Sequence, residues 1–198
     1  MQDNLWFRSL VWTDYRLAVL FTVILPLILL IWAFVQKAEA IQRLLIIYWR
    51  VASLLAITLY LMMASWPIGF VSSFFSRILI PISLWFWVDI NEEIDDMSSR
   101  PLKLALSAWR WAVTIYCTLG TLALIPFLPC AFSQGMIKTP FCQVWLEAPW
   151  LYKSYFHANY KPEFLGFVGM ACLIIYVLYL ASFVLLRLGK QGRSAMEQ

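Results

Sequence analysis

Residues 17–35 read LAVLFTVILPLILLIWAFV, a run of 19 residues without a charged side chain. Arg16 precedes this run and Lys37 follows it closely. A helix of about 20 apolar residues crosses the hydrocarbon core of a bilayer, so the run predicts a transmembrane helix. Pro26 lies in its middle and should kink the helix or leave a backbone carbonyl free, which neighbouring helices can satisfy inside a membrane.

Four more apolar runs follow. Phe164–Leu186 is also uncharged, and each of the other three contains a single arginine: Leu44–Trp66 with Arg50, Ile68–Val88 with Arg77, and Leu104–Leu128 with Arg110. The 198-residue chain is 63% hydrophobic and 13% charged, which leaves too few polar side chains to cover a water-soluble fold. We therefore expect an all-α, polytopic transmembrane helical bundle of about five membrane-spanning helices.

The third run is the least regular, because Pro67 and Gly69 interrupt the apolar stretch before Arg77. The alternative is a bundle of four crossing helices in which residues 70–88 form a re-entrant segment. A buried arginine costs at least about 2.5–3.5 kcal/mol at the bilayer centre, so Arg77 and Arg110 are candidate intramembrane polar sites. Arg110 could instead extend to the cytosolic interface. For Arg77, we consider an anionic lipid headgroup or the hydroxyls of Ser72, Ser73 and Ser76 as partners.

We interpret residues 1–198 as a single membrane-embedded domain, with a loop at 129–163 and a tail at 187–198. Five crossings place nine cations on the side of the tail, namely Lys37, Arg43, Arg50, Arg100, Lys103, Arg110, Arg187, Lys190 and Arg193. Six lie on the other side, namely Arg8, Arg16, Arg77, Lys138, Lys153 and Lys161. The positive-inside rule then predicts an extracytoplasmic N-terminus and loop, and a cytosolic C-terminus.

Two cysteines, Cys130 and Cys142, lie 12 positions apart in the long loop. Disulfides persist on the extracytoplasmic side of membranes, so a Cys130–Cys142 bridge is our prediction. The alternative is a pair of reduced loop cysteines.

Acidic residues gather directly after the third run. Asp89, Glu92, Glu93 and Asp96 have the spacing i, i+3, i+4, i+7, which places four carboxylates on one face if the third helix continues one or two turns past the membrane. Such a face needs counter-charges, and we consider either Mg²⁺, which prefers oxygen ligands, or the nearby Arg100 and Lys103. The alternative is that these residues bind no cation and form a solvated acidic segment next to the membrane helix.

The stretch Asn91-Glu-Glu-Ile-Asp95, followed by Arg100-Pro101, resembles the first Asp-rich motif of UbiA-type membrane prenyltransferases. In that family such segments hold magnesium and a diphosphate at the membrane surface. The chain departs from the pattern in three ways: Asn91 stands where an Asp is expected, a second Asp-rich motif is missing, and the chain is far shorter.

Several functions are disfavoured by what the sequence lacks. His157 is the only histidine, which excludes haem held by paired transmembrane histidines, and neither a Gly-rich phosphate loop nor a G-x-S-x-G motif is present. The apolar runs contain no Asp, Glu or Lys, which argues against an ion-coupled transporter. The cations are scattered, so we expect no nucleic-acid partner.

Three stretches, Arg8–Leu20, Pro26–Trp32 and Pro101–Arg110, resemble a family of uncharacterised membrane proteins of cyanobacteria and plastids. The resemblance covers most of the chain and implies a plasma or thylakoid membrane, but no activity.

We therefore expect a non-catalytic accessory, assembly or scaffold component of a membrane complex, for example a photosynthetic complex of the thylakoid, without a cofactor. Its partners would be the lipid bilayer and other membrane proteins. One alternative is a Mg²⁺-dependent lipid- or isoprenoid-processing enzyme that uses the acidic cluster at 89–96. Another is a small transporter built around the break between Pro67 and Arg77.

Overall fold

The computed structural model describes residues 6–98, 100–133 and 135–188, with the backbone alone at 186–188. Residues 189–198 of the expected tail, including Lys190 and Arg193, lie outside this part. All regular elements in the described residues are helices. Five are long and apolar enough to cross a membrane, which confirms the predicted class: Arg8–Val35, Glu39–Met63, Ile68–Trp85, Pro101–Phe127 and Pro162–Leu185.

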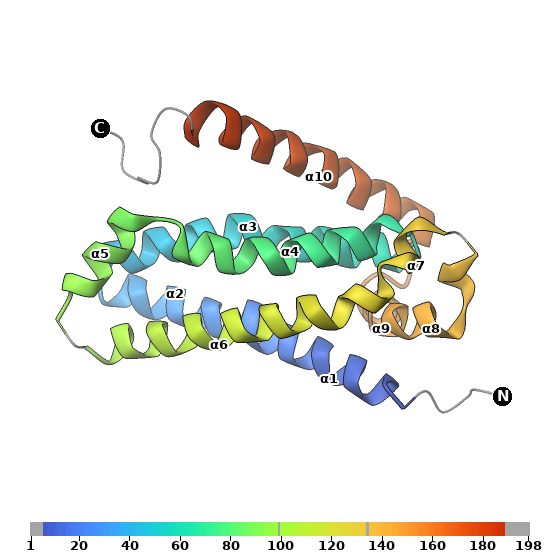
Figure 1. Ribbon diagram of the computed structural model, residues 1–198, viewed down its shortest axis with the longest axis horizontal. Helices are drawn as coiled ribbons and strands as arrows, with labels where there is room; N and C mark the ends of the chain where they lie inside the picture. The colour runs from blue at the N-terminus through green and yellow to red at the C-terminus, as the bar shows by residue number, and fades with distance from the viewer. Residues whose placement is uncertain (1–5, 99, 134, 189–198) are drawn as a thin grey trace.

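These spans are antiparallel to their chain neighbours, so the molecule has two ends (Figure 1). The spans are built from α1 (Arg8–Val19), the π-helical turn η1 (Leu20–Ile24), α2 (Leu25–Val35), α3 (Glu39–Met63), α4 (Ile68–Trp85), α6 (Pro101–Leu124) with η2 (Ile125–Phe127), and α10 (Pro162–Ser182) with the π-helical η5 (Phe183–Leu188). The α5 end carries the α2–α3 turn and α5 (Val88–Asp96). The opposite, disulfide end carries the start of α1 and the short helices α7 (Pro129–Phe132), η3 (Met136–Lys138), α8 (Pro140–Gln143), η4 (Val144–Leu146) and α9 (Glu147–Phe156).

The first span begins well before the uncharged run, at Arg8 rather than at Leu17. Its first turns are helical because they pack on the short helices of the disulfide end, where Val11 joins a buried cluster that includes Trp145. Asp14 consequently lies inside a candidate span. The apolar run Leu17–Val35 is therefore shorter than the helix, which carries a carboxylate outside that run.

Residues 68–85 of the third run form one continuous helix, α4, which crosses the bundle beside α3 (Figure 1). The turn before it places Ser65 in the left-handed region at φ 57°, and the helix continues through Pro81. A re-entrant segment at 70–88 is therefore not what the chain forms, and the five-helix reading holds.

Pro26 has the effect that the sequence predicts. The turn before it widens into the π-helical η1, and two of its backbone carbonyls accept hydrogen bonds from other helices. Tyr48 Oη donates to the carbonyl of Thr22 at 2.7 Å, and Trp109 Nε1 donates to that of Phe21 at 2.8 Å. Both donors are buried, so the freed backbone groups become tie points between the first span, α3 and α6.

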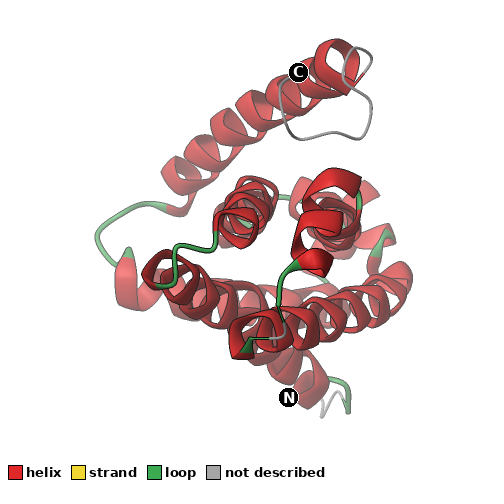
Figure 2. Ribbon diagram, turned by 90° about the vertical axis from the view of Figure 1, so that its left-hand side faces the viewer, coloured by secondary structure: helices red, strands yellow, loops and turns green. Residues whose placement is uncertain are grey.

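The last helix, α10, is attached to the bundle mainly through its first turns. Gly166 and Gly169 face α3 so closely that a Cβ on Gly166 would lie 2.5 Å from the Cβ of Ala64. Small residues allow this approach between membrane helices. Beyond them α10 diverges from the other helices (Figure 2).

Candidate functional site

A buried ion pair joins α1 to α4. Arg77 presents its guanidinium to both carboxylate oxygens of Asp14, and Nη1 donates to Oδ1 at 3.0 Å while Nη2 donates to Oδ2. The two side chains are 7% and 18% exposed. Bidentate pairs of this kind are among the stronger charge-assisted hydrogen bonds.

The helix α6 completes this site with Tyr116 and Gly120. The hydroxyl of Tyr116 donates to Asp14 Oδ1 at 3.0 Å, and its ring centroid lies 5.3 Å from the guanidinium carbon of Arg77. A Cβ at position 120 would lie only 1.8 Å from Arg77 Nη1, so glycine provides the space that the guanidinium occupies. Three helices therefore meet at one polar cluster, consisting of Asp14, Arg77, Tyr116 and Gly120.

The serines near Arg77 in the sequence have other partners. Ser72 shares a 2.6 Å hydrogen bond with Thr58 of α3, and Ser76 donates to the carbonyl of Ser73 at 2.8 Å. Arg77 therefore pairs with Asp14 rather than with these serine hydroxyls. The guanidinium faces the interior, where Asp14 balances its charge.

Arg110 is also held inside the protein, and only 4% of it is exposed. Its Nη2 donates to the carbonyl of Leu84 at 3.0 Å and to Asn91 Oδ1 at 2.9 Å. Its guanidinium carbon lies 4.0 Å from the ring centroid of Trp85. Carbonyl, amide and aromatic groups at the end of α4 and in α5 therefore surround the guanidinium of Arg110.

The acidic residues that the sequence singled out lie on α5. Glu93 pairs with Arg43 of α3 at 3.1 Å, and Lys103 donates to the backbone carbonyls of Asp95 and Met97 rather than to a carboxylate. Glu92 and Asp96 are exposed, and Asp89 is half-buried. Among the residues described, no three His, Cys, Asp or Glu side chains are grouped as a metal site requires. A cation at this cluster stays a prediction from the sequence.

At the disulfide end, Cys130 and Cys142 are joined in a buried disulfide that links α7 to α8, with their Cα atoms 5.9 Å apart. Arg8 and Trp12 both donate to Glu147 of α9, at 2.9 and 2.8 Å, which ties α1 to this end. The ring of His157 lies in an aromatic environment, and its Nε2 is 3.1 Å from the hydroxyl of Tyr60.

The sequence identified Arg77 but missed its partners Asp14, Tyr116 and Gly120. Asp14 seemed to lie outside the membrane because it precedes the uncharged run by three residues. One signal was available: an arginine within an apolar run needs a compensating group, and Asp14 is the carboxylate nearest to the start of the first run.

Comparison with known proteins gives one match. Neither the curated proteins nor the solved structures include a match to the chain. A family described as "Protein of unknown function (DUF3177)" matches residues 8–196, which include every polar group described above. The chain, which has five candidate membrane-spanning helices and a buried ion pair between two of them, therefore belongs to the DUF3177 family.

Proposed function

We propose that the protein is a non-catalytic accessory or assembly component of a complex in a plasma or thylakoid membrane, and that α10 is the helix through which it contacts its partner. The observation that carries this proposal is the isolation of α10 within the chain. Only 6% of its most apolar stretch is buried, against 50% for α4.

The buried polar groups support a structural rather than a catalytic role. Asp14 and Arg77 neutralise each other, and Arg110 donates hydrogen bonds to Leu84 and Asn91. Catalytic sites instead keep a base or nucleophile poised in a pocket that a substrate can enter. In the described residues these charged groups hold helices together.

The outward face of α10 is a continuous apolar stripe. Its members are spaced by seven and four residues, which places them on one side of a helix, and each is more than half exposed: Phe167, Ile174 and Leu178. Membrane helices associate through close van der Waals packing rather than through a hydrophobic driving force. A helix that exposes this stripe and packs on its own chain chiefly through α3 suits packing against another protein.

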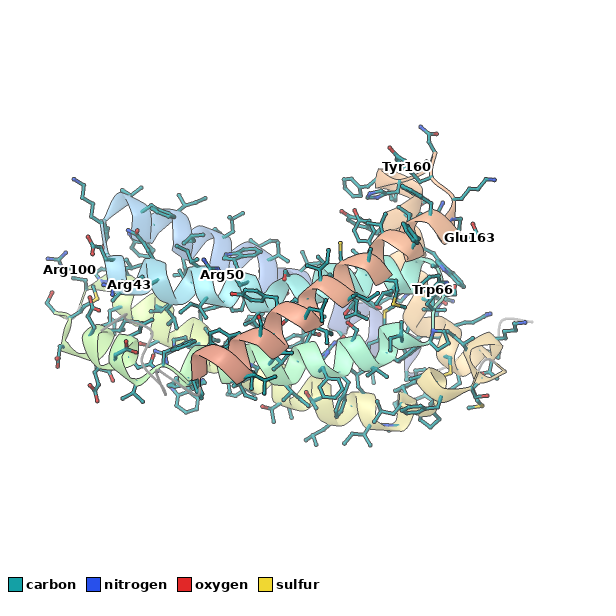
Figure 3. All side chains as sticks on the ribbon, turned by 90° about the horizontal axis from the view of Figure 1, so that it is seen from above. Arg43, Arg50, Trp66, Arg100, Tyr160 and Glu163 are labelled. Atoms are coloured by element: carbon teal, nitrogen blue, oxygen red, sulfur yellow. A yellow bond between two sulfur atoms is a disulfide. The ribbon has the colours of Figure 1, made fainter. Side chains whose placement is uncertain are left out.

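The charges and the disulfide support one orientation for this complex. Arg43 and Arg100 lie at the end opposite to Tyr160 and Glu163 (Figure 3). The disulfide belongs to the latter end. We place the α5 end in the cytosol or stroma and the disulfide end on the oxidising side, in keeping with the positive-inside rule and disulfide compartments.

Site-specific photocrosslinking in native membranes tests the role of α10. A benzophenone amino acid replaces Leu178 on the outward stripe, and a matched probe replaces Leu119 on α6. The two side chains are 65% and 62% exposed, so lipid reaches both equally. We expect a discrete crosslinked protein from position 178 and none from position 119.

Crosslinks to lipid alone from both positions would overturn the proposal. The same discrete product from both positions would also count against it, because α10 would then not be the specific contact.

A further inference from the structure

A cavity of about 270 Å³ lies between the diverging part of α10 and the pair α3 and α4. Its walls are mostly apolar, and they include Val51 of α3, Trp87 at the start of α5, and Phe183 of η5. Contacts on its rim hold the walls apart at a fixed spacing. Tyr176 Oη donates to the carbonyl of Val51 at 3.3 Å, and the rings of Phe183 and Trp87 meet edge to face at 5.8 Å.

One charged residue, Arg50, lines this cavity. Arg50 is 11 positions after Glu39, so it lies about 16 Å along the axis of α3 from the first residue of that helix. It is exposed, and it makes no side-chain hydrogen bond or ion pair within the described part of the chain. Figure 3 shows it further along α3 than Arg43, toward the place where α10 crosses.

Arg50 differs in this respect from the arginines of the next two spans. Arg77 is neutralised by Asp14, and Arg110 is bonded to Leu84 and Asn91. An arginine at this depth in a membrane is costly unless a negative or polar group accompanies it. Because the described chain provides none to Arg50, the partner should come from outside it and should be negatively charged.

We propose that this cavity binds one anionic bilayer lipid, with an acyl chain between α10 and the α3–α4 pair and the negatively charged headgroup on Arg50. The cavity is near the lower end of ligand-pocket volumes, so it takes part of one chain rather than a whole lipid. A guanidinium binds a phosphate or sulfonate oxygen through charge-assisted hydrogen bonds, which a zwitterionic headgroup offers less strongly. The lipid fills the space that separates α10 from the bundle.

Native mass spectrometry of the full-length protein tests this binding. The protein is reconstituted in vesicles with equal amounts of phosphatidylglycerol and phosphatidylcholine, then extracted in mild detergent and analysed for retained lipid. We expect one phosphatidylglycerol per chain, preferred over phosphatidylcholine by at least about tenfold, as a charge-assisted bond in an apolar site would give.

Three variants test whether the lipid binds in this cavity and through Arg50. Arg50→Gln should abolish the preference for phosphatidylglycerol, and Arg100→Gln, which removes an exposed cation at the same end but outside the cavity, should keep it. Leu180→Trp fills the cavity from α10 and keeps Arg50, so it should lose the bound lipid altogether.

Absence of the preference in the wild-type protein would overturn the proposal, as would a preference that survives Arg50→Gln. Retention of the lipid by Leu180→Trp would overturn its placement in the cavity. If Arg50→Gln does not fold, the amount of lipid retained by Leu180→Trp decides whether the lipid binds in the cavity. Because the readout is lipid rather than protein, a failure here is distinct from a failure of the α10 crosslinking experiment.

Discussion

The three arginines of the apolar runs illustrate three ways of placing a cation in a membrane protein. Arg77 is neutralised by a carboxylate, Arg110 is solvated by a carbonyl, an amide and an indole ring, and Arg50 faces a cavity. The first arrangement carries the greatest consequence for folding. Removal of one partner of a buried ion pair leaves the other charge uncompensated, which costs more than the pair contributes when intact.

Asp14→Asn should therefore destabilise the protein by about 3–5 kcal/mol. Arg77→Leu combined with Asp14→Leu should recover much of this loss, because no charge then remains buried. Thermal unfolding in detergent micelles measures both effects. The matched control is Glu147→Gln, which removes the partly exposed ion pair between Glu147 and Arg8. Arg8 lies on α1, as Asp14 does, and the loss should cost no more than about 1 kcal/mol of stability. Equal effects of Asp14→Asn and Glu147→Gln would contradict the central role of the Asp14–Arg77 pair.

At the scale of the element, Pro26 determines how the first span joins its neighbours. The apolar run predicts the helix and the proline predicts a freed carbonyl, and both are found. The donors were not predictable, because Tyr48 and Trp109 lie 26 and 88 residues from their acceptors. Hydropathy shows that a segment enters the membrane, but it does not show which faces of two distant helices meet.

A double-mutant cycle tests this element. Tyr48→Phe leaves the carbonyl of Thr22 buried without its donor and should cost about 1–3 kcal/mol. In a Pro26→Ala background the helix regains a backbone N–H for one of the carbonyls in η1, so Tyr48→Phe should cost measurably less. Thermal unfolding of the four proteins gives the coupling between the two positions. Additive effects would show that the hydroxyl of Tyr48 does not compensate for the proline.

At the scale of the whole molecule, the number of spans and their approximate limits could be predicted from composition and run length. The predicted limits of a span were wrong where packing extends a helix beyond its apolar run, as at the start of the first span. The first turns of α1, which carry charged residues, are helical because they pack on the disulfide end. For this reason the sequence did not identify Asp14 as the partner of Arg77. The acidic residues do lie on one helix, but α5 is separate from α4 rather than its continuation. Its Glu93 pairs with Arg43 from a helix distant in sequence.

The orientation can be tested with single cysteines at opposite ends, in a Cys172→Ser background that removes the exposed free thiol. A membrane-impermeant maleimide should label Lys161→Cys in intact cells or sealed right-side-out vesicles. It should label Glu92→Cys only after permeabilisation. One span, Pro101–Phe127, separates positions 92 and 161 and places them on opposite sides of the membrane. The reverse pattern would invert the orientation, and early labelling of both would exclude five crossings.

The pairing of Asp14 with Arg77 also has a consequence for biosynthesis. Asp14 is translated 63 residues before Arg77, an interval of roughly 3–13 s at the ~5–20 residues per second of protein synthesis. During this interval the carboxylate has no guanidinium, so the first helix should remain in the insertion channel or at the membrane surface. Its release into lipid then depends on the arrival of α4, and Tyr116, which is 102 residues after Asp14, joins last.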